Sequence, residues 1–230
     1  MHAAQNHLVE LLPRVDRQRL LAACEPVDLQ LGEVLCERGD AVHHVYFPID
    51  GFISLLMQSD HHPSLEVGMV GREGMVGAAL LLGVGAEPLQ ALVQGAGSTL
   101  RMSKEAFDNE LDMSPTLRRV VGRFVFVRLS QMAGLAACMR FHLIGQRLAR
   151  WLLMSQDRAH AAQFHVTHEF LAAMLGVRRV GITAAAGELA RQGLITYHRG
   201  ELTVLDRTGL ERASCACYAA DRSIYREHLA

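Results

Sequence analysis

The chain has 230 residues, of which 50% are hydrophobic and 20% are charged. This length and composition suffice for two small domains with packed cores, and they exclude an intrinsically disordered chain. We find no unbroken apolar run of about 18 residues and no apolar leader segment, so we expect neither a membrane span nor a signal peptide. The five scattered cysteines do not form a disulfide framework, which indicates a cytoplasmic protein.

The charge is distributed unevenly along the chain. Residues 1–110 contain 7 Lys and Arg against 15 Asp and Glu, a net charge of −8, whereas residues 111–230 contain 16 against 9, a net charge of +7. This division indicates an acidic module joined to a module that meets an anion, and double-stranded DNA is the leading candidate. Arginine-rich helices also occur as solvated surfaces, so charge alone leaves that alternative open.

The first hundred residues predict a helix followed by a β-rich domain. Residues 8–24 have the apolar spacing of one amphipathic helix. The short apolar or alternating runs that follow are broken by Gly, Pro and Asp, which predicts a β-roll, barrel or sandwich. These runs are 27–31, 44–47, 52–57, 65–70, 89–94 and 99–102, and residues 73–86 leave room for a short helix.

Two helices are predicted next. Ser103 caps the first, over residues 103–112, and Ser114 with Pro115 begins a longer one. The long helix has two apolar stripes, of which the first (Leu117, Val120, Phe124, Val127) is expected to cover the β-domain. The second stripe is expected to pair with a twin helix in a homodimer, although burial inside a single domain is an alternative. The dimerisation candidates are Val121, Val125, Arg128, Met132 and Leu135.

A helix-turn-helix pattern lies in the basic half, after a predicted helix at 141–157 and a short strand at 163–166. Thr167 can cap a first helix, and Gly176 can end it in a left-handed conformation. Ala172 is small where two helices cross, and Ile182 is an aliphatic residue buried from the second helix. These residue types at these offsets are typical of a helix-turn-helix.

Hairpin signals follow the second helix. Gly193 is expected to end that helix, and residues 194–197 and 202–205 flank the turn formed by Arg199 and Gly200. A helix-turn-helix followed by a hairpin is a winged helix; a plain helical hairpin is the alternative.

The second helix of such a motif lies in the major groove, and Arg178 and Arg179 stand at its beginning. Arginine can pair with both O6 and N7 of guanine, so Arg179 is the main candidate for base reading, and Arg178 is assigned to phosphate. Weaker base contacts are expected from Thr183 and Ala184, and further phosphate contacts from His168, His198 and Arg199.

Motifs at both ends of the chain resemble the Crp/Fnr family of transcription regulators. They are the turn Gly32–Asp40, the pair Tyr46-Phe47, the segment Gly51–Ile53, the segment Val166–Gly176 and the segment Gly193–Ile195. The resemblance covers nearly the whole chain. It implies a cyclic-nucleotide-binding-like β-roll, a homodimer through the long helix, and control of transcription initiation, with RNA polymerase as a further candidate partner.

The chain departs from the family pattern in the phosphate cassette. The similar segment is Gly74–Ala79, with Ala78 where the ribose-binding Glu is expected, and no Lys or Arg lies between Arg72 and Arg101. A buried phosphate without a paired cation is unfavourable, so we expect that cAMP does not bind in the usual way.

Other departures concern the operator and the cofactor. Val180 and Ala184 stand where many family members carry Glu and Arg, so we expect a different half-site. An N-terminal cysteine cluster for an iron–sulfur centre is absent, and Cys215 with Cys217 alone is too short a spacing to specify a metal. We therefore expect no metal and no cofactor, and we assign no effector.

Two other functions fit parts of the sequence. A cupin-like metal enzyme would use His43-His44 or His61-His62, but adjacent strand residues point to opposite faces. A protein-interaction module could use the winged helix to bind protein, although the basic C-terminal half argues against this.

The sequence thus predicts an α+β chain without enzymatic activity and in three parts: a β-roll sensor domain at residues 1–113, a dimerisation helix and hinge at 114–140, and a winged helix-turn-helix DNA-binding domain at 141–230.

Overall fold

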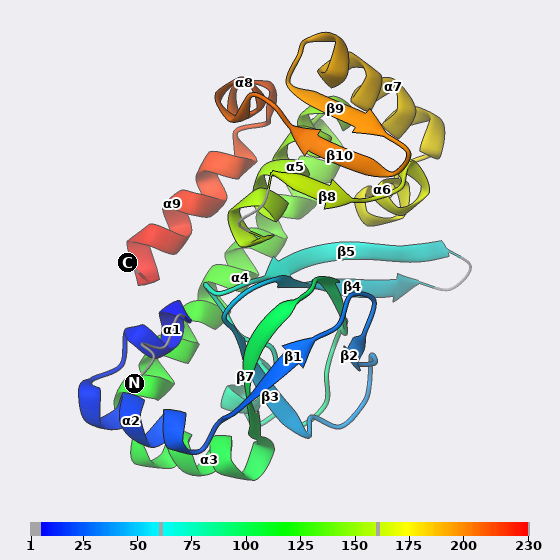
Figure 1. Ribbon diagram of the computed structural model, residues 1–230. Coiled ribbons are helices and arrows are strands. Elements are labelled where there is room, and N and C mark those ends of the chain that lie inside the picture. Colours follow the sequence, from blue (N-terminus) through cyan, green and yellow to red (C-terminus); the bar gives the residue numbers. More distant parts are fainter. Residues whose placement is uncertain (1–5, 60–61, 160–161, 230) are drawn as a thin grey trace.

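The computed structural model describes residues 6–59, 62–159 and 162–229. A β-roll at one end of the molecule is joined by a long helix to a smaller winged-helix part at the other end, and a last helix runs back along the long one (Figure 1). The fold is α+β, as predicted from the sequence.

The β-roll consists of two antiparallel sheets. One sheet has the strand order β1-β7-β3, and the other has the order β2-β6-β4-β5. Apolar side chains from both sheets, such as Leu29 of one sheet and Ile53 of the other, pack together in one buried core. The strands are β1 (Glu25–Leu29), β2 (Val34–Cys36), β3 (His44–Pro48), β4 (Phe52–Ser59), β5 (His62–Val70), β6 (Gln90–Gly95) and β7 (Gly97–Ser103). A 3-10 helix, η1 (Ala78–Leu82), lies between β5 and β6.

The predicted single helix at residues 8–24 is wrong, because the structure has two: α1 (His7–Glu10) and α2 (Arg14–Ala22). Pro13 separates them, since proline has no N–H to donate within a helix. Asn6 caps α1, and its buried amide also donates to the carbonyls of Pro48 and Gly74.

The next two helices have the predicted caps. Ser103 caps α3 (Lys104–Met113), and Ser114 caps α4 (Pro115–Phe141), whose first residue is the expected proline. The first predicted stripe of α4, which begins with Leu117, is buried against the β-roll.

The C-terminal part begins with α5 (Ile144–Ala159), whose apolar face, which includes Trp151 and Leu152, is buried in the core of this part. It contains α6 (His168–Leu175), α7 (Arg179–Arg191), α8 (Arg207–Ala213) and a sheet of order β8-β10-β9. The strands are β8 (Gln163–His165), β9 (Ile195–His198) and β10 (Glu201–Val204).

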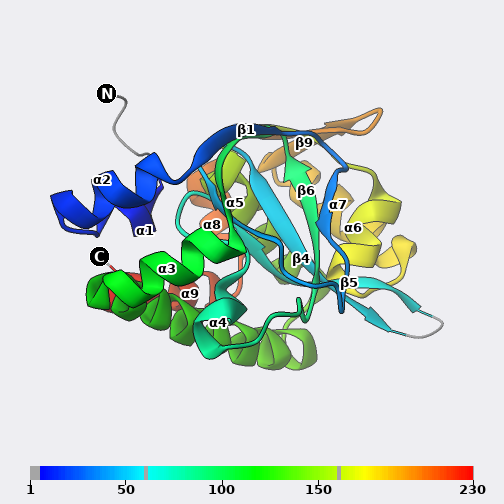
Figure 2. The same cartoon turned by 90° about the horizontal axis from the view of Figure 1, so that it is seen from below.

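The last helix, α9 (Cys217–Leu229), leaves the winged-helix part and lies beside α4 (Figures 1 and 2). Leu229 joins the core that contains Leu8 and Phe107, and Tyr225 packs against that core. Tyr218, near the start of α9, is instead buried in the core of the winged-helix part, so α9 packs against both parts of the molecule.

Candidate nucleic-acid interface

A tight turn sets the angle between α6 and α7. Thr167 caps α6 by accepting from the N–H of Phe170, and Gly176 ends it with φ 61° and ψ 43°. The two helices meet at 108°, within the range of a helix-turn-helix. Ala172 is 5% exposed and Ile182 fully buried, which confirms the packing predicted for these positions.

The outer face of α7 is open to solvent. Arg178, the N-cap, and Arg179, the first helical residue, are both exposed, as are Thr183 and Ala184 farther along. Arg179 has only a distant partner, Glu169, with Nε and Oε2 3.9 Å apart and both side chains at least 70% exposed. Such a pair contributes little, so the guanidinium of Arg179 is available to a ligand.

Val180 on the same face is 72% exposed, which is unusual for an aliphatic side chain. Sequence reasoning treated this position only as a departure from the family pattern. An exposed aliphatic group in the major groove can contact the methyl group of thymine. Val180 therefore joins the candidate base-reading residues.

His168 packs between α7 and the wing. Its ring stacks on Tyr197 with centroids 4.4 Å apart, and its Nδ1 lies 3.1 Å from the hydroxyl of Thr183. Its Nε2 is buried without a partner among the described residues. Burial, together with the charge of Arg179, lowers the pKa of His168. In this conformation His168 joins α6 to α7 and to the wing, and its contact with a DNA phosphate stays a prediction.

The wing is the hairpin of β9 and β10. Arg199 and Gly200 at its tip have φ of 50° and 86°, as a two-residue hairpin turn of this type requires. His198 and Arg199 are exposed there, which leaves both available for phosphate contacts. The predicted hairpin is confirmed.

The five residues predicted for dimerisation lie on different sides of α4. Val121 is fully buried in the core of its own chain. Arg128 donates to a backbone carbonyl of β5, and Leu135 lines a cavity between α4 and α5. For Val121 and Arg128 the assignment to the outer face was wrong, because the helix is apolar on most sides and the sequence does not show which side faces the β-roll. Leu135 is half-buried, and its part in dimerisation stays a prediction. Val125 and Met132 lie at the edge of the outer face.

The outer apolar face of α4 is formed by Phe126, Leu129, Met132, Ala133 and Ala136, all of which are exposed. Leu129 at its centre is 65% exposed. By length and composition α4 could cross a membrane, which differs from the expectation of no such segment. Only 22% of its 18-residue apolar window is buried within the chain, so most of this window is left for another partner to cover. An apolar face this open indicates a partner surface.

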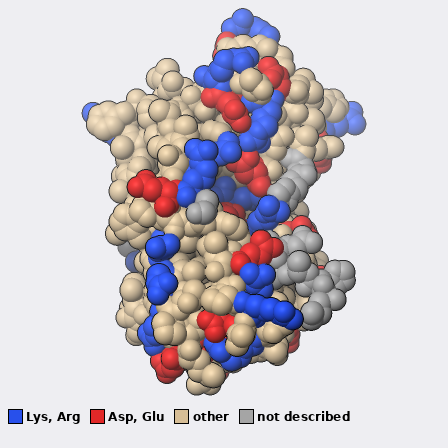
Figure 3. All heavy atoms as spheres, turned by 90° about the vertical axis from the view of Figure 1, so that its left-hand side faces the viewer, with Lys and Arg blue, Asp and Glu red and all other residues tan. Residues whose placement is uncertain are grey.

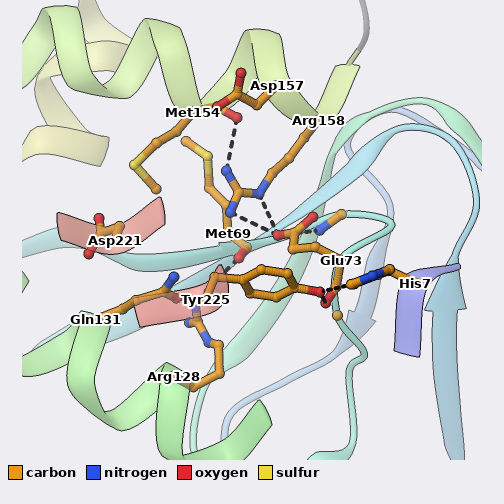
Figure 4. Close-up of polar contacts among 12 residues, drawn as sticks. His7, Met69, Glu73, Arg128, Gln131, Met154, Asp157, Arg158, Asp221 and Tyr225 are labelled. Atoms are coloured by element: carbon orange, nitrogen blue, oxygen red, sulfur yellow. Dashed lines mark hydrogen bonds and ion pairs between the residues drawn. The ribbon is translucent and has the colours of Figure 1, made fainter. Parts of the chain in front are cut away.

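Polar contacts join the two halves of the molecule (Figure 4). Arg158 of α5 donates to Glu73 in the loop after β5, with Nε and Oε1 2.8 Å apart. Tyr225 of α9 donates to the carbonyl of Glu73, and its hydroxyl lies 2.7 Å from Nδ1 of His7. On the face of the molecule beside α9, basic and acidic side chains are intermixed (Figure 3). At the start of α7, by contrast, the adjacent side chains of Arg178 and Arg179 are both exposed, with Glu169 3.9 Å from Arg179.

A buried carboxylate lies at the same junction. Glu66 of β5 accepts from the hydroxyl of Ser54 at 2.6 Å and from the indole N–H of Trp151 at 3.0 Å. Burial raises the pKa of Glu66 to about 7, in spite of these two donors and of the charges of Arg158 and Arg150. The sequence could not reveal this pair, because 85 residues separate Glu66 from Trp151.

The β-roll has a cavity of about 140 Å³ beside the cassette segment. Its lining is mostly apolar and includes Ala78 and Leu89. It contains one cation, Arg128, whose Nη1 already donates to Met69 and Gln131, and one acid, Glu87, whose pKa is raised by burial.

Of the two histidine pairs considered for a metal enzyme, only His43-His44 lies wholly within the described residues. His44 lies on β3, and His61 is outside the described residues. Among the residues that the structure describes, the group close enough to share an ion includes neither His43 nor His44. This group consists of Cys138, His142, Cys215 and Cys217.

Two family models match separate segments of the chain. A cyclic nucleotide-binding domain matches residues 26–114, and a Crp-like helix-turn-helix domain matches residues 146–213. A comparison with curated protein sequences gives no match.

Solved structures share the fold over most of the chain. A c-di-GMP-responsive global regulator from Xanthomonas campestris has a TM-score of 0.68 at 19% identity, with 84% of this chain and 99% of that chain covered. A Crp/Fnr-family regulator from Eubacterium rectale has a TM-score of 0.70 at 17% identity, with 90% and 96% covered. FixK2 from Bradyrhizobium japonicum has a TM-score of 0.70 at 14% identity, with 84% and 98% covered.

These structures establish a shared architecture, and the two models match its sensor part and its DNA-binding part in the order seen here. The angle between α6 and α7, and the exposed arginines at the start of α7, are the features that such a DNA-binding part needs. Regulators of this family are generally non-enzymatic. The chain therefore belongs to the Crp/Fnr family of DNA-binding transcription regulators.

Proposed function

We propose that this regulator binds a specific palindromic DNA site as a homodimer, in the cytoplasm, without cAMP and without catalysing a reaction. The observation that carries the proposal is the exposed pair Arg178 and Arg179 at the start of α7, where a recognition helix meets base edges. RNA polymerase is a candidate partner once the dimer is on DNA.

The homodimer forms along the outer apolar face of α4. A twin helix packed there would remove Leu129 and its neighbours from water, with the spacing of three and four residues that helix pairing uses. In such a pair the two α7 helices face successive major grooves about 34 Å apart. Coverage by a partner helix rather than by lipid accounts for the apolar character of α4.

The β-roll cavity does not favour a cyclic nucleotide. A cyclic phosphate placed there would meet Glu87, and Nη1 of Arg128 already donates to Met69 and Gln131, which leaves the buried Nη2 of this guanidinium without a partner among the described residues. We expect isothermal titration calorimetry with cAMP to show no binding in the micromolar range. Saturable heat with a micromolar dissociation constant would contradict this prediction.

Binding is tested by fluorescence anisotropy with DNA from upstream of the regulator's own gene, a scrambled duplex as competitor, and no added nucleotide. We expect salt-dependent binding that the scrambled duplex does not displace. If both duplexes bind equally, the measurement is repeated with genomic fragments. Equal binding to all of these fragments would instead favour a winged helix that binds protein.

Replacing Arg179 with alanine is expected to weaken binding to the specific site by about 1–3 kcal/mol and to relax the choice of base at one position. The control is Arg14→Ala, which removes an exposed arginine from α2 and should leave DNA binding unchanged. An equal loss of affinity for specific and scrambled DNA would reassign Arg179 to a phosphate contact.

A further inference from the structure

Four side chains with metal-binding atoms meet where α4, α5 and α9 come together. Cys138 lies near the end of α4, and His142 directly follows the last residue of that helix. Cys215 lies in the connection between α8 and α9, and Cys217 is the first residue of α9. One ligand atom from each of the four residues lies within 4.8 Å of all the others.

The spacing of these atoms fits a tetrahedral ion. The Sγ atoms of Cys138 and Cys215 are 3.5 Å apart, and Sγ of Cys217 is 3.5 Å from Nδ1 of His142. Zinc bonds of about 2.3 Å to sulfur and about 2.0 Å to nitrogen place the donors of a tetrahedron about 3.5–3.8 Å apart. A disulfide would need sulfurs about 2.05 Å apart, so Cys138 and Cys215 are not bonded to each other.

The surroundings also suit a closed structural site. Cys138 and Cys215 are buried, and His142 and Cys217 are half-buried. Three thiolates and a neutral imidazole around a divalent ion leave one negative charge, and the guanidinium of Arg150 lies close enough for its charge to act on all three cysteines. Four protein donors leave no open coordination position, as in structural rather than catalytic zinc sites.

We propose that Cys138, His142, Cys215 and Cys217 bind one Zn²⁺. Soft thiolate donors select zinc over magnesium or calcium. All four residues lie outside the two segments that the family models match, 26–114 and 146–213, so the site belongs to this chain rather than to the matched domains.

The ion would join three elements that meet only in the folded protein. It fastens the start of α9 to the end of α4, and His142 stands in the connection that leads to α5 and the DNA-binding part. Zinc would therefore hold α9 along α4 and restrict the hinge between the dimerisation helix and the winged helix.

The test is the metal content of the full-length protein, purified under reducing conditions and measured by inductively coupled plasma mass spectrometry. We expect about one zinc per chain in the unmodified protein and close to none in the double variant Cys215→Ser, Cys217→Ser. The matched control is the double variant Cys24→Ser, Cys36→Ser, which changes two half-buried cysteines outside the cluster and should keep its zinc.

Cobalt gives a second readout that does not depend on the double variant being folded. Co²⁺ added to the chelator-treated protein should give the visible bands of tetrahedral coordination together with thiolate-to-metal charge transfer. His142→Ala, at a half-buried position, should weaken metal retention against a chelator and alter this spectrum.

Three results would overturn the proposal: protein without bound metal that binds no cobalt, bound iron with the absorption of an iron–sulfur cluster, or a disulfide between Cys138 and Cys215 in protein purified under these conditions. None of these measurements involves DNA, so failure of the zinc site is distinguishable from failure of the proposed DNA binding.

Discussion

Replacing Leu129 with aspartate is expected to convert the homodimer into a monomer. Leu129 is the centre of the outer apolar face of α4, and in a symmetric pair the two new carboxylates would lie close together and away from water. A monomer engages one half-site, so affinity for the palindromic site should fall by about 10²–10⁴-fold. Sedimentation velocity reports the oligomeric state, and fluorescence anisotropy reports the affinity.

A matched control separates dimer loss from a general effect of the new charge. Leu31→Asp introduces the same charge at a leucine that is 60% exposed, in the turn after β1, and should leave the dimer and the DNA affinity unchanged. Circular dichroism should show both variants folded, because neither position is buried in the protomer. A Leu129→Asp protein that stays dimeric would show that the chains pair through another surface.

Replacing Glu66 with glutamine is expected to remove a pH-dependent cost to folding. The unfolded carboxyl releases its proton near pH 4.5, whereas burial holds the folded pKa at about 7. The folded chain therefore binds more protons than the unfolded chain between these values, so stability falls as the pH rises through this window. The full cost, present above the folded pKa, is about 3 kcal/mol.

Glutamine has a similar shape and can still accept from Trp151, while the hydroxyl of Ser54 can turn to accept from the amide. Urea unfolding should show the variant to be more stable than the unmodified protein by about 3 kcal/mol at about pH 8, and that advantage should disappear near pH 5. The control Glu105→Gln changes an exposed carboxyl of α3 and should not alter the pH dependence. An advantage of equal size at both pH values would contradict the assigned cause.

The features predicted correctly from the sequence depend on contacts within a few residues. Thr167 and Ser114 cap helices because their hydroxyls reach an N–H three residues ahead, and Gly176 ends α6 because glycine adopts a positive φ without strain. The hairpin turn at Arg199 and Gly200 is local for the same reason. Such features, taken in order along the chain, were enough to indicate the family and its DNA-binding part.

The errors and omissions concern contacts between distant segments. The side of α4 that stays exposed depends on how the β-roll and α9 cover the others, so Leu129 was missed and Val121 was misassigned. The stacking of His168 on Tyr197 likewise exists only after the wing has docked.

The cysteine cluster and the buried carboxylate show the same limit most clearly. Cys138 and Cys215 are 77 residues apart in the chain, and no local spacing marks them as partners. Residue types and short spacings therefore determined the fold class and the recognition helix, because their physical causes are steric and local. The dimer face, the interdomain carboxylate and the proposed zinc site depended on packing, which brings distant residues within bonding distance only when the whole chain is folded.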